Sequence, residues 1–375
     1  MIEQLIKDRR ALHQIPEVGF NCPQTKAYIT NRLQEMGCEI IEVGAGLVTL
    51  IEGAHPGKTI LLRADYDALP MKEESGLPFS SQTENAHTCG HDLHTAMLLG
   101  AVEELIQRKS EIHGTIKCMF QPAEEILAGA RNMIEAGILE NPKVDAAFAI
   151  HTGLKGPVGS YQVALGTMAT SCDNFRIDIQ GKGSHGAYPE EAFDPIAAGV
   201  LIYQQMSQLI AREVNPNQVA TLTFGQFTAG NSSNVIPDTA TMQGTLRAYD
   251  ESLRSNLKER MNQIVSAIES MTRCTIKLDF YSGTVSLTND PELTQKVIKI
   301  LEETQPDLLC NFGEKMMASE DFAEISMRVP STYLMMNCQV PGNSFTHHHP
   351  KVEFDEALLP LGMKAFVEIA IRLIK

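Results

Sequence analysis

Basic residues are in short supply in this chain of 375 residues. It has 31 lysine and arginine residues against 46 aspartate and glutamate residues, which leaves a formal net charge of −15 at pH 7. Nucleic acids and anionic membranes bind proteins through clustered lysine and arginine. The charge balance therefore argues against nucleic acid and against a membrane surface as the main partner.

Long apolar runs and a paired cysteine pattern are also missing, and we expect no secretory leader. No run of about 18 apolar residues occurs, so we expect no transmembrane helix. The opening segment, MIEQLIKDRRALHQ, is charged throughout and lacks the apolar stretch of a signal peptide. Eight cysteines without a paired pattern are typical of a reducing compartment. We therefore expect a cytoplasmic protein.

What the sequence does have is material for a folded core. Hydrophobic residues make up 43% of the chain and charged residues 21%, proportions that exclude a disordered protein. At roughly 150 residues per domain, the length predicts two or three domains.

Strands and helices alternate through the first part of the sequence. A helix is expected over residues 1–37, with an interruption between Pro16 and Pro23 because proline breaks helices. Short apolar runs that suit buried strands then alternate with segments of helical periodicity, which predicts an α/β domain with a mixed central sheet. The predicted strands are 38–51, 58–63, 115–120 and 145–150, and the predicted helices are 94–107 and one that ends at 132–137.

The pattern changes near residue 170. Residues 175–179 alternate apolar and polar side chains with a period of two, as in an antiparallel sheet with one buried face. Because two long amphipathic helices separate such strands, we predict a smaller α+β insert at 171–285 with two helices on one face of a sheet. Its other expected elements are strands within 218–227 and 239–248 and helices near 195–211 and 253–271.

The α/β pattern returns beyond the insert. A helix is expected around 287–289, then a strand at 332–337 and a terminal helix at 356–374. We therefore predict a catalytic domain in two segments, 1–170 and 286–375.

Polar side chains follow three of the predicted strands. Asp65 and Asp67 come after the first strong strand, Glu124 and Glu125 after the next, and His151 after the third. Each alone has a plainer explanation as a helix cap, a solvated face or a core histidine. Ligand sites in open α/β sheets gather beyond the carboxyl ends of strands, so the convergence of all three favours a site.

A metal centre is the chemistry these residues suit. Cys89 and His91, at the start of a predicted helix, place a thiolate and an imidazole within reach of one ion, which suits Zn, Co or Ni, and carboxylates extend the range to Mn. The cluster 347–349 adds histidines, although a surface loop is its plainer explanation. With Glu125 and His151 the set suffices for two divalent metal ions, about 3.5–4 Å apart if a ligand bridges them.

The adjacent glutamates suit a division of labour. One can bind metal while the other faces a water, takes its proton as a general base and later gives that proton to a leaving amine. The metals would lower the pKa of the water and polarise the carbonyl of an amide substrate.

These motifs resemble the M20 metallopeptidase family, in particular its amidohydrolase branch of indole-acetyl-amino-acid hydrolases, hippurate hydrolases and N-acetyl-amino-acid deacetylases. The resemblance runs across the whole chain in the family's order. It implies a dinuclear catalytic domain interrupted by a dimerisation or lid domain, and a homodimer through that lid. The matching segments are RRALHQIPE (9–17), LRADYDALP (62–70), HTCGHDLHT (87–95), FQPAEE (120–125), GKGSHG (181–186), NVIP (234–237), GTLR (244–247) and SEDF (319–322).

The resemblance also implies a role for individual residues. Glu124 is similar to the family's proton acceptor, and Asp65 to an aspartate that orients a metal-side group, with Asp67 as the alternative. Pro350 makes His348 the histidine of a His-x-Pro pattern. The implied metal ligands are Cys89, His91, Glu125, His151 and His348.

Three residues of the insert are implied to act on the substrate. His185 is similar to a histidine that reaches a neighbouring active site and steadies the oxyanion, although a histidine in a glycine-rich loop is also an ordinary surface residue. Asn234 and Arg247 are similar to residues that grip the substrate, and Arg247 suits a free α-carboxylate.

The expected function is metal-dependent hydrolysis of the amide bond of N-acyl amino acids, N-acetyl ones in the first place, by a metal-activated water with Glu124 as general base. One alternative is a dipeptidase or aminopeptidase of the same fold, which would need an acidic partner for the substrate's free amine. Another is a metal-binding protein without activity, against which the presence of Glu124 together with the whole ligand set argues.

Overall fold

The computed structural model describes residues 1–373, which form two compact units. Unit 1 contains residues 1–168, 287–315 and 321–373, and unit 2 contains residues 169–286 and 316–320. The roles foreseen for them, catalysis for the first and a lid or dimer contact for the second, remain predictions. Within the described residues, no helix has both the length and the apolar character that a membrane crossing requires.

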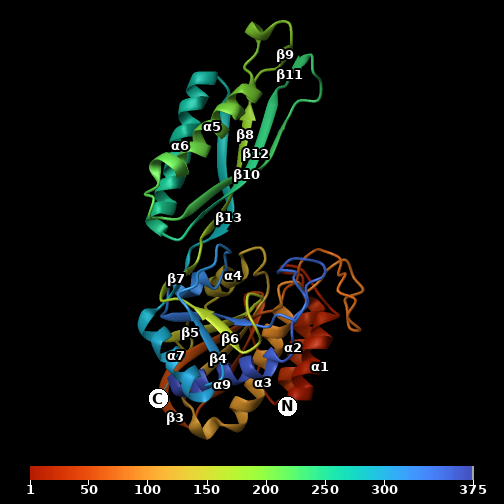
Figure 1. Cartoon of the computed structure of the whole chain (residues 1–375), viewed down its shortest axis with the longest axis vertical. Helices are drawn as coiled ribbons and strands as arrows, with labels where there is room; N and C mark the ends of the chain where they lie inside the picture. Colours follow the sequence, from red (N-terminus) through yellow and green to blue (C-terminus); the bar gives the residue numbers. More distant parts are fainter. Residues whose placement is uncertain (374–375) are drawn as a thin grey trace. The chain divides into compact units, whose positions relative to one another are not determined.

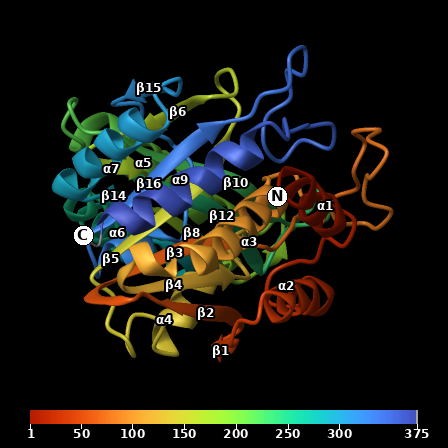
Figure 2. The same cartoon turned by 90° about the horizontal axis from the view of Figure 1, so that it is seen from below.

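An eight-stranded mixed sheet forms the centre of unit 1, as predicted for an α/β domain (Figure 2). Its strand order is β1-β2-β4-β3-β5-β16-β6-β15. Strand β3 runs parallel to β4 and β5, and β5 runs parallel to β16, so the carboxyl ends of these four strands meet at one edge. The strands are β1 (Ile41–Val43), β2 (Gly46–Glu52), β3 (His55–Asp65), β4 (His113–Gln121), β5 (Ala146–Gly153), β6 (Ser160–Val163), β15 (Leu309–Phe312) and β16 (Ser331–Asn337).

Helices α1, α3, α7 and α9 form a layer against this sheet (Figure 2). Helix α3 is buried on nearly all sides, because it packs between α1, α9 and strand β3. The expected break in the N-terminal helix is confirmed, since α1 ends at His13 and α2 begins at Pro23, in a first turn that tolerates proline. The helices of unit 1 are α1 (Ile2–His13), α2 (Pro23–Glu35), α3 (His91–Gln107), α4 (Gly129–Glu135), α7 (Pro291–Thr304), α8 (Ala323–Ser326) and α9 (Leu358–Leu373).

The helix expected around 287–289 is wrong. Residues Leu287–Asn289 form strand β14, which pairs with β7 (Gly166–Ala169). Helix α7 starts only after Asp290, whose side chain accepts a hydrogen bond from the amide of Leu293 and so caps the helix. The predicted terminal helix is present as α9, and its expected last residue, Ile374, lies outside the described residues.

Unit 2 contains a four-stranded antiparallel sheet of order β10-β12-β8-β13, with α5 and α6 on one face (Figure 1). The period of two predicted this correctly, because Phe175, Ile177 and Ile179 of β8 are buried. Strand β13 was not among the predicted elements, and its register against β8 shifts between Phe280 and Ser282. The elements are β8 (Cys172–Gln180), β9 (Ser184–His185), α5 (Pro195–Glu213), β10 (Ala220–Ala229), β11 (Val235–Ile236), β12 (Thr239–Ala248), α6 (Glu251–Thr272) and β13 (Thr275–Thr284).

Candidate metal centre

The candidate site lies where the carboxyl ends of β3, β4 and β5 meet the first turn of α3. Asp65 is the last residue of β3, and the two glutamates follow β4. His151 was expected just after its strand, but β5 continues to Gly153 and places His151 inside it. Helix α3 begins at His91 rather than at His94, so Cys89 precedes its first turn.

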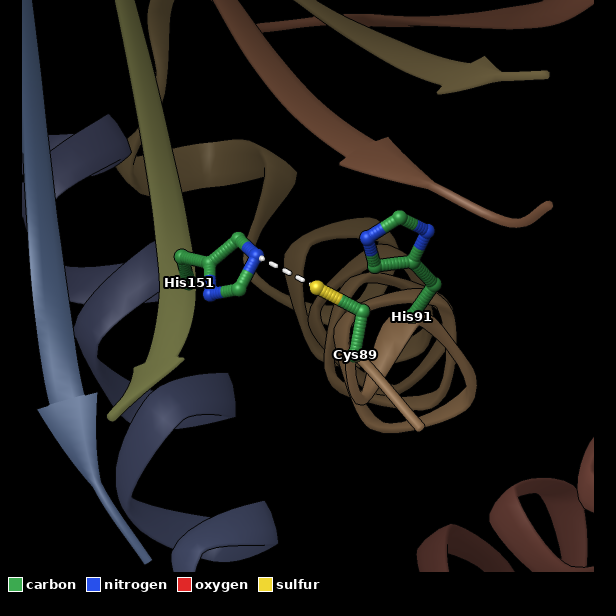
Figure 3. Close-up of side chains that lie close together, drawn as sticks. All are labelled: Cys89, His91 and His151. Atoms are coloured by element: carbon green, nitrogen blue, oxygen red, sulfur yellow. Dashed lines mark hydrogen bonds between the residues drawn. The ribbon is translucent and has the colours of Figure 1, made fainter. Parts of the chain in front are cut away.

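Cys89, His91 and His151 form one group of candidate ligands (Figure 3). Their ligand atoms lie within 4.8 Å of one another, and the Sγ atom of Cys89 is 3.6 Å from Nε2 of His151. Each imidazole donates from Nδ1 to a backbone carbonyl, His91 to Asp67 at 2.9 Å and His151 to Thr152 at 2.8 Å. In the neutral form of each ring, this arrangement leaves Nε2 with its lone pair, the form in which histidine binds a metal.

Three further groups share a residue with the first, and one of them joins His91 to Asp65 and His94. The other two contain the glutamates. His91, Glu124 and Glu125 form one of them, with Nε2 of His91 3.9 Å from a carboxylate oxygen of each glutamate. Cys89, Glu125 and His348 form the other, and Nε2 of His348 lies 3.4 Å from Oε2 of Glu125. Because Cys89, His91 and Glu125 each belong to more than one group, the site suits a pair of metal ions that share ligands.

The buried polar atoms and carboxylates of the site favour the binding of cations. Nε2 of His91 and Oε1 of Glu125 are buried and have no hydrogen-bond partner within the described residues, a costly state that a bound cation would relieve. Burial lowers the pKa of His91, but Asp65, Asp67 and Glu125 outweigh it and raise the pKa to about 10. Burial, followed by the nearby carboxylates of Glu125, Glu124 and Asp65, raises the pKa of the Cys89 thiol well above its usual value. The donor set therefore fits two divalent metal ions, which would also stabilise the thiolate.

The two aspartates contact different parts of the site. Asp65 pairs with Arg63 and accepts a 2.6 Å hydrogen bond from Nδ1 of His94. Burial raises the pKa of Asp65, but Arg63, His91 and His94 outweigh burial and hold this pKa well below its usual value. Asp67 accepts from the amides of Glu124 at 3.0 Å and Glu125 at 3.2 Å. Asp67 thus fixes the backbone of the glutamate pair.

The three neighbouring histidines separate in space. His348 has a left-handed φ of 63°, donates its amide to the carbonyl of Thr88 and turns its ring toward Glu125. The ring of His347 faces His151 at 5.6 Å, and the ring of His349 stacks on Phe345 at 4.1 Å. Within residues 1–373, His348 is the member of this cluster that joins a ligand group, although its assignment as a ligand remains a prediction.

Sequence reasoning gave no role to His94 or Thr152, which the structure places beside the candidate ligands. Nε2 of His94 accepts from the amide of Thr152 at 2.9 Å, and its ring lies 4.5 Å from that of His151. The spacing of His91 and His94 could have indicated that His94 lies at the site, because residues three apart share one face of a helix. Nothing in the sequence pattern points to Thr152.

The implied substrate residues all lie in unit 2. His185, in β9, pairs with Val235, and the carbonyl of Asn234 accepts from the amide of Gly186 at 2.8 Å. The structure therefore brings His185 and Asn234 together at the short two-stranded sheet of β9 and β11, where both are exposed. Arg247 lies apart from them on β12, where it donates to the hydroxyl of Ser319. The catalytic and binding roles of these three residues remain predictions.

Comparison with known proteins gives matches along the whole chain. Residues 61–372 match the family model described as Peptidase family M20/M25/M40. Thermostable carboxypeptidase 1 of Saccharolobus solfataricus is 36% identical over 98% of this chain and 95% of the relative. N-acetylcysteine deacetylase of Bacillus subtilis is 34% identical over 98% of this chain and 96% of the relative. The crystal structure of a dinuclear metal-binding peptidase of family M20 from Bacillus subtilis aligns with a TM-score of 0.86 at 32% identity, covering 100% of this chain and 98% of that one.

Proposed function

Because the chain belongs to peptidase family M20/M25/M40 and is a hydrolase, we propose that it hydrolyses the amide bond of N-acyl amino acids with two divalent metal ions. The observation that carries this proposal is the set of overlapping groups of thiol, imidazole and carboxylate side chains, which lie next to Glu124. The proposed ligands are Cys89, His91, Glu125, His151 and His348.

The chain's own residues divide the work of the reaction. Bound divalent ions would supply Lewis-acid chemistry, which lowers the pKa of water and polarises the scissile carbonyl. Glu124, held through its amide by Asp67, takes a proton from the attacking water and gives it to the leaving nitrogen. We assign to Asp67, rather than to Asp65, the orienting role, because Asp67 contacts the backbone of both glutamates and accepts from His91 through its carbonyl. Asp65 instead orients His94.

The relatives support a substrate whose leaving group is an amino acid with a free α-carboxylate. A deacetylase of N-acetylcysteine and a carboxypeptidase both release such a leaving group, while their acyl parts differ. Arg247 is the proposed partner of this carboxylate and Asn234 a further substrate contact. An aminopeptidase would instead require an acidic group for the free amine, so it fits these relatives less well.

The remaining features of the proposal concern metal, assembly and location. Thiolate and imidazole favour zinc, cobalt or nickel, and the carboxylates admit manganese. We propose a cytoplasmic location and a homodimer through unit 2. Such a dimer would let the partner's His185 reach the site.

A substrate panel tests this proposal. N-acetyl amino acids, N-benzoyl amino acids, dipeptides and amino-acid amides are compared by kcat/KM with the metal-loaded protein. We expect turnover of the N-acyl amino acids and little of the amides, which have a free amine and no α-carboxylate. Faster hydrolysis of the amides than of every N-acyl amino acid would favour the aminopeptidase instead.

The Cys89→Ser variant is expected to lose affinity for one metal ion. A serine hydroxyl stays mostly protonated and is a hard ligand, whereas the thiolate of Cys89 is a soft one. Metal content after dialysis, measured by mass spectrometry, checks this. Cys118→Ala is the matched control, because Cys118 is buried in β4 and belongs to none of the ligand groups of residues 1–373. Unchanged metal content and activity in Cys89→Ser would show that Cys89 is an ordinary cysteine.

A further inference from the structure

Thr152 connects the two segments that carry the thiol–imidazole group. It follows His151 in β5 and is fully buried. Its hydroxyl donates to the carbonyl of Cys89 at 2.9 Å, and its own carbonyl accepts from Nδ1 of His151 at 2.8 Å. One residue therefore holds the backbone of one candidate ligand and the ring of another, although the two ligands are far apart in the sequence.

The approach of the two segments is close enough to require glycine. Gly90 has a left-handed φ of 87°, and a Cβ atom built on it would lie 2.6 Å from the hydroxyl oxygen of Thr152. The side chain of Thr152 thus fills the space that a larger residue at position 90 would need. This close fit sets the distance between the Cys89 peptide and strand β5.

The backbone amide of Thr152 is its third polar group, and it is held by His94. Nε2 of His94 accepts from the amide of Thr152 at 2.9 Å, and Nδ1 donates to Asp65 at 2.6 Å. One neutral tautomer of His94 satisfies both bonds. A β-bulge or a register shift of β5 at this point would break the hydrogen bond between Thr152 and His94. The hydrogen bonds between Asp65 and His94 and between His94 and Thr152 therefore fix the position of β5 at His151.

We propose that Thr152 is a positioning residue for the metal centre: its hydroxyl on the Cys89 carbonyl and its amide on His94 hold Cys89 and His151 at the separation that one metal ion requires. The inference deepens the proposed function and rests on it, because it concerns the same site. Residues that orient metal ligands typically change metal affinity by about 10–100-fold when they are replaced.

Three variants separate the hydroxyl from the methyl group of Thr152. Thr152→Val keeps the shape and loses the hydroxyl, Thr152→Ser keeps the hydroxyl, and Thr152→Ala loses both. The Ser and Ala variants differ from each other only in the hydroxyl, so they carry the test if the Val variant does not fold. Thr284→Val in unit 2 is the control, since Thr284 is also buried and its hydroxyl has no hydrogen-bond partner within the described residues.

Each metal-free protein is titrated with Co²⁺, and the thiolate-to-cobalt absorption band and the dissociation constants are recorded. We expect Thr152→Val and Thr152→Ala to bind one ion about 10–100-fold more weakly with a reduced band, and Thr152→Ser and Thr284→Val to match the wild type. Wild-type affinity and band in Thr152→Ala, or equal losses in Thr152→Ser and Thr152→Ala, would overturn the inference alone. A wild-type protein that binds no cobalt would overturn the proposed function together with it.

Discussion

Replacement of Glu124 by glutamine is expected to remove most of the hydrolytic activity while the fold and the metal content stay unchanged. Glutamine has nearly the same shape but cannot accept the proton of the attacking water. Loss of a general base typically costs about 10²–10⁴-fold in rate. The hydrogen bond that places this residue runs from its amide to Asp67, so the substitution leaves it in place.

Kinetics and metal analysis of the same preparation check this prediction. Glu125→Gln is the matched control, because the neighbouring residue is a proposed ligand and its loss should lower metal content as well as activity. A Glu124→Gln variant with full metal occupancy and near-wild-type turnover would show that another group is the base.

The His185→Ala variant is expected to lower kcat strongly without a change in metal content. A donor that steadies an oxyanion acts on the transition state, and removal of one such donor costs about 10²–10³-fold in kcat. His185 is exposed on the two-stranded sheet of β9 and β11, where its loss removes no core packing. Steady-state kinetics and metal analysis measure both quantities.

Mixing two inactive variants then shows whose site His185 serves. If the histidine acts across a dimer, a mixed dimer of His185→Ala and Glu124→Gln chains has one intact site and one doubly damaged site. Activity should therefore return in part once the subunits have exchanged. No recovery after verified exchange would mean that His185 serves its own chain or has no part in catalysis.

The buried strands were predictable from the sequence because such strands have a simple signature, although β5 continues past its predicted end to Gly153. The apolar runs before Asp65, Glu124 and His151 place these residues at one edge of the sheet, where β3, β4 and β5 run parallel. The ligand groups that contain Cys89 and His91 form at this edge. The period of two likewise predicted the antiparallel strands β8, β10 and β12, whereas β13 was missed.

Contacts between residues far apart in the sequence could not be predicted from the sequence pattern. Thr152 is an unremarkable residue until β5 is placed against the peptide of Cys89, and the choice between Asp65 and Asp67 needs the position of the glutamate amides. Short or irregular strands were missed for a related reason. The three residues of β14 are too few to show a period, and their stability comes from pairing with β7.

The central claim is that divalent metal held by this cluster is needed for hydrolysis of N-acyl amino acids. Its most direct test is the hydrolysis of an N-acetyl amino acid by one preparation before treatment with a chelator, after metal removal and after metal is added back, with bound metal measured at each stage. We predict about two ions per chain, loss of activity on removal and recovery on restoration, in line with two-metal hydrolysis. Full activity in protein that contains no metal would contradict the account.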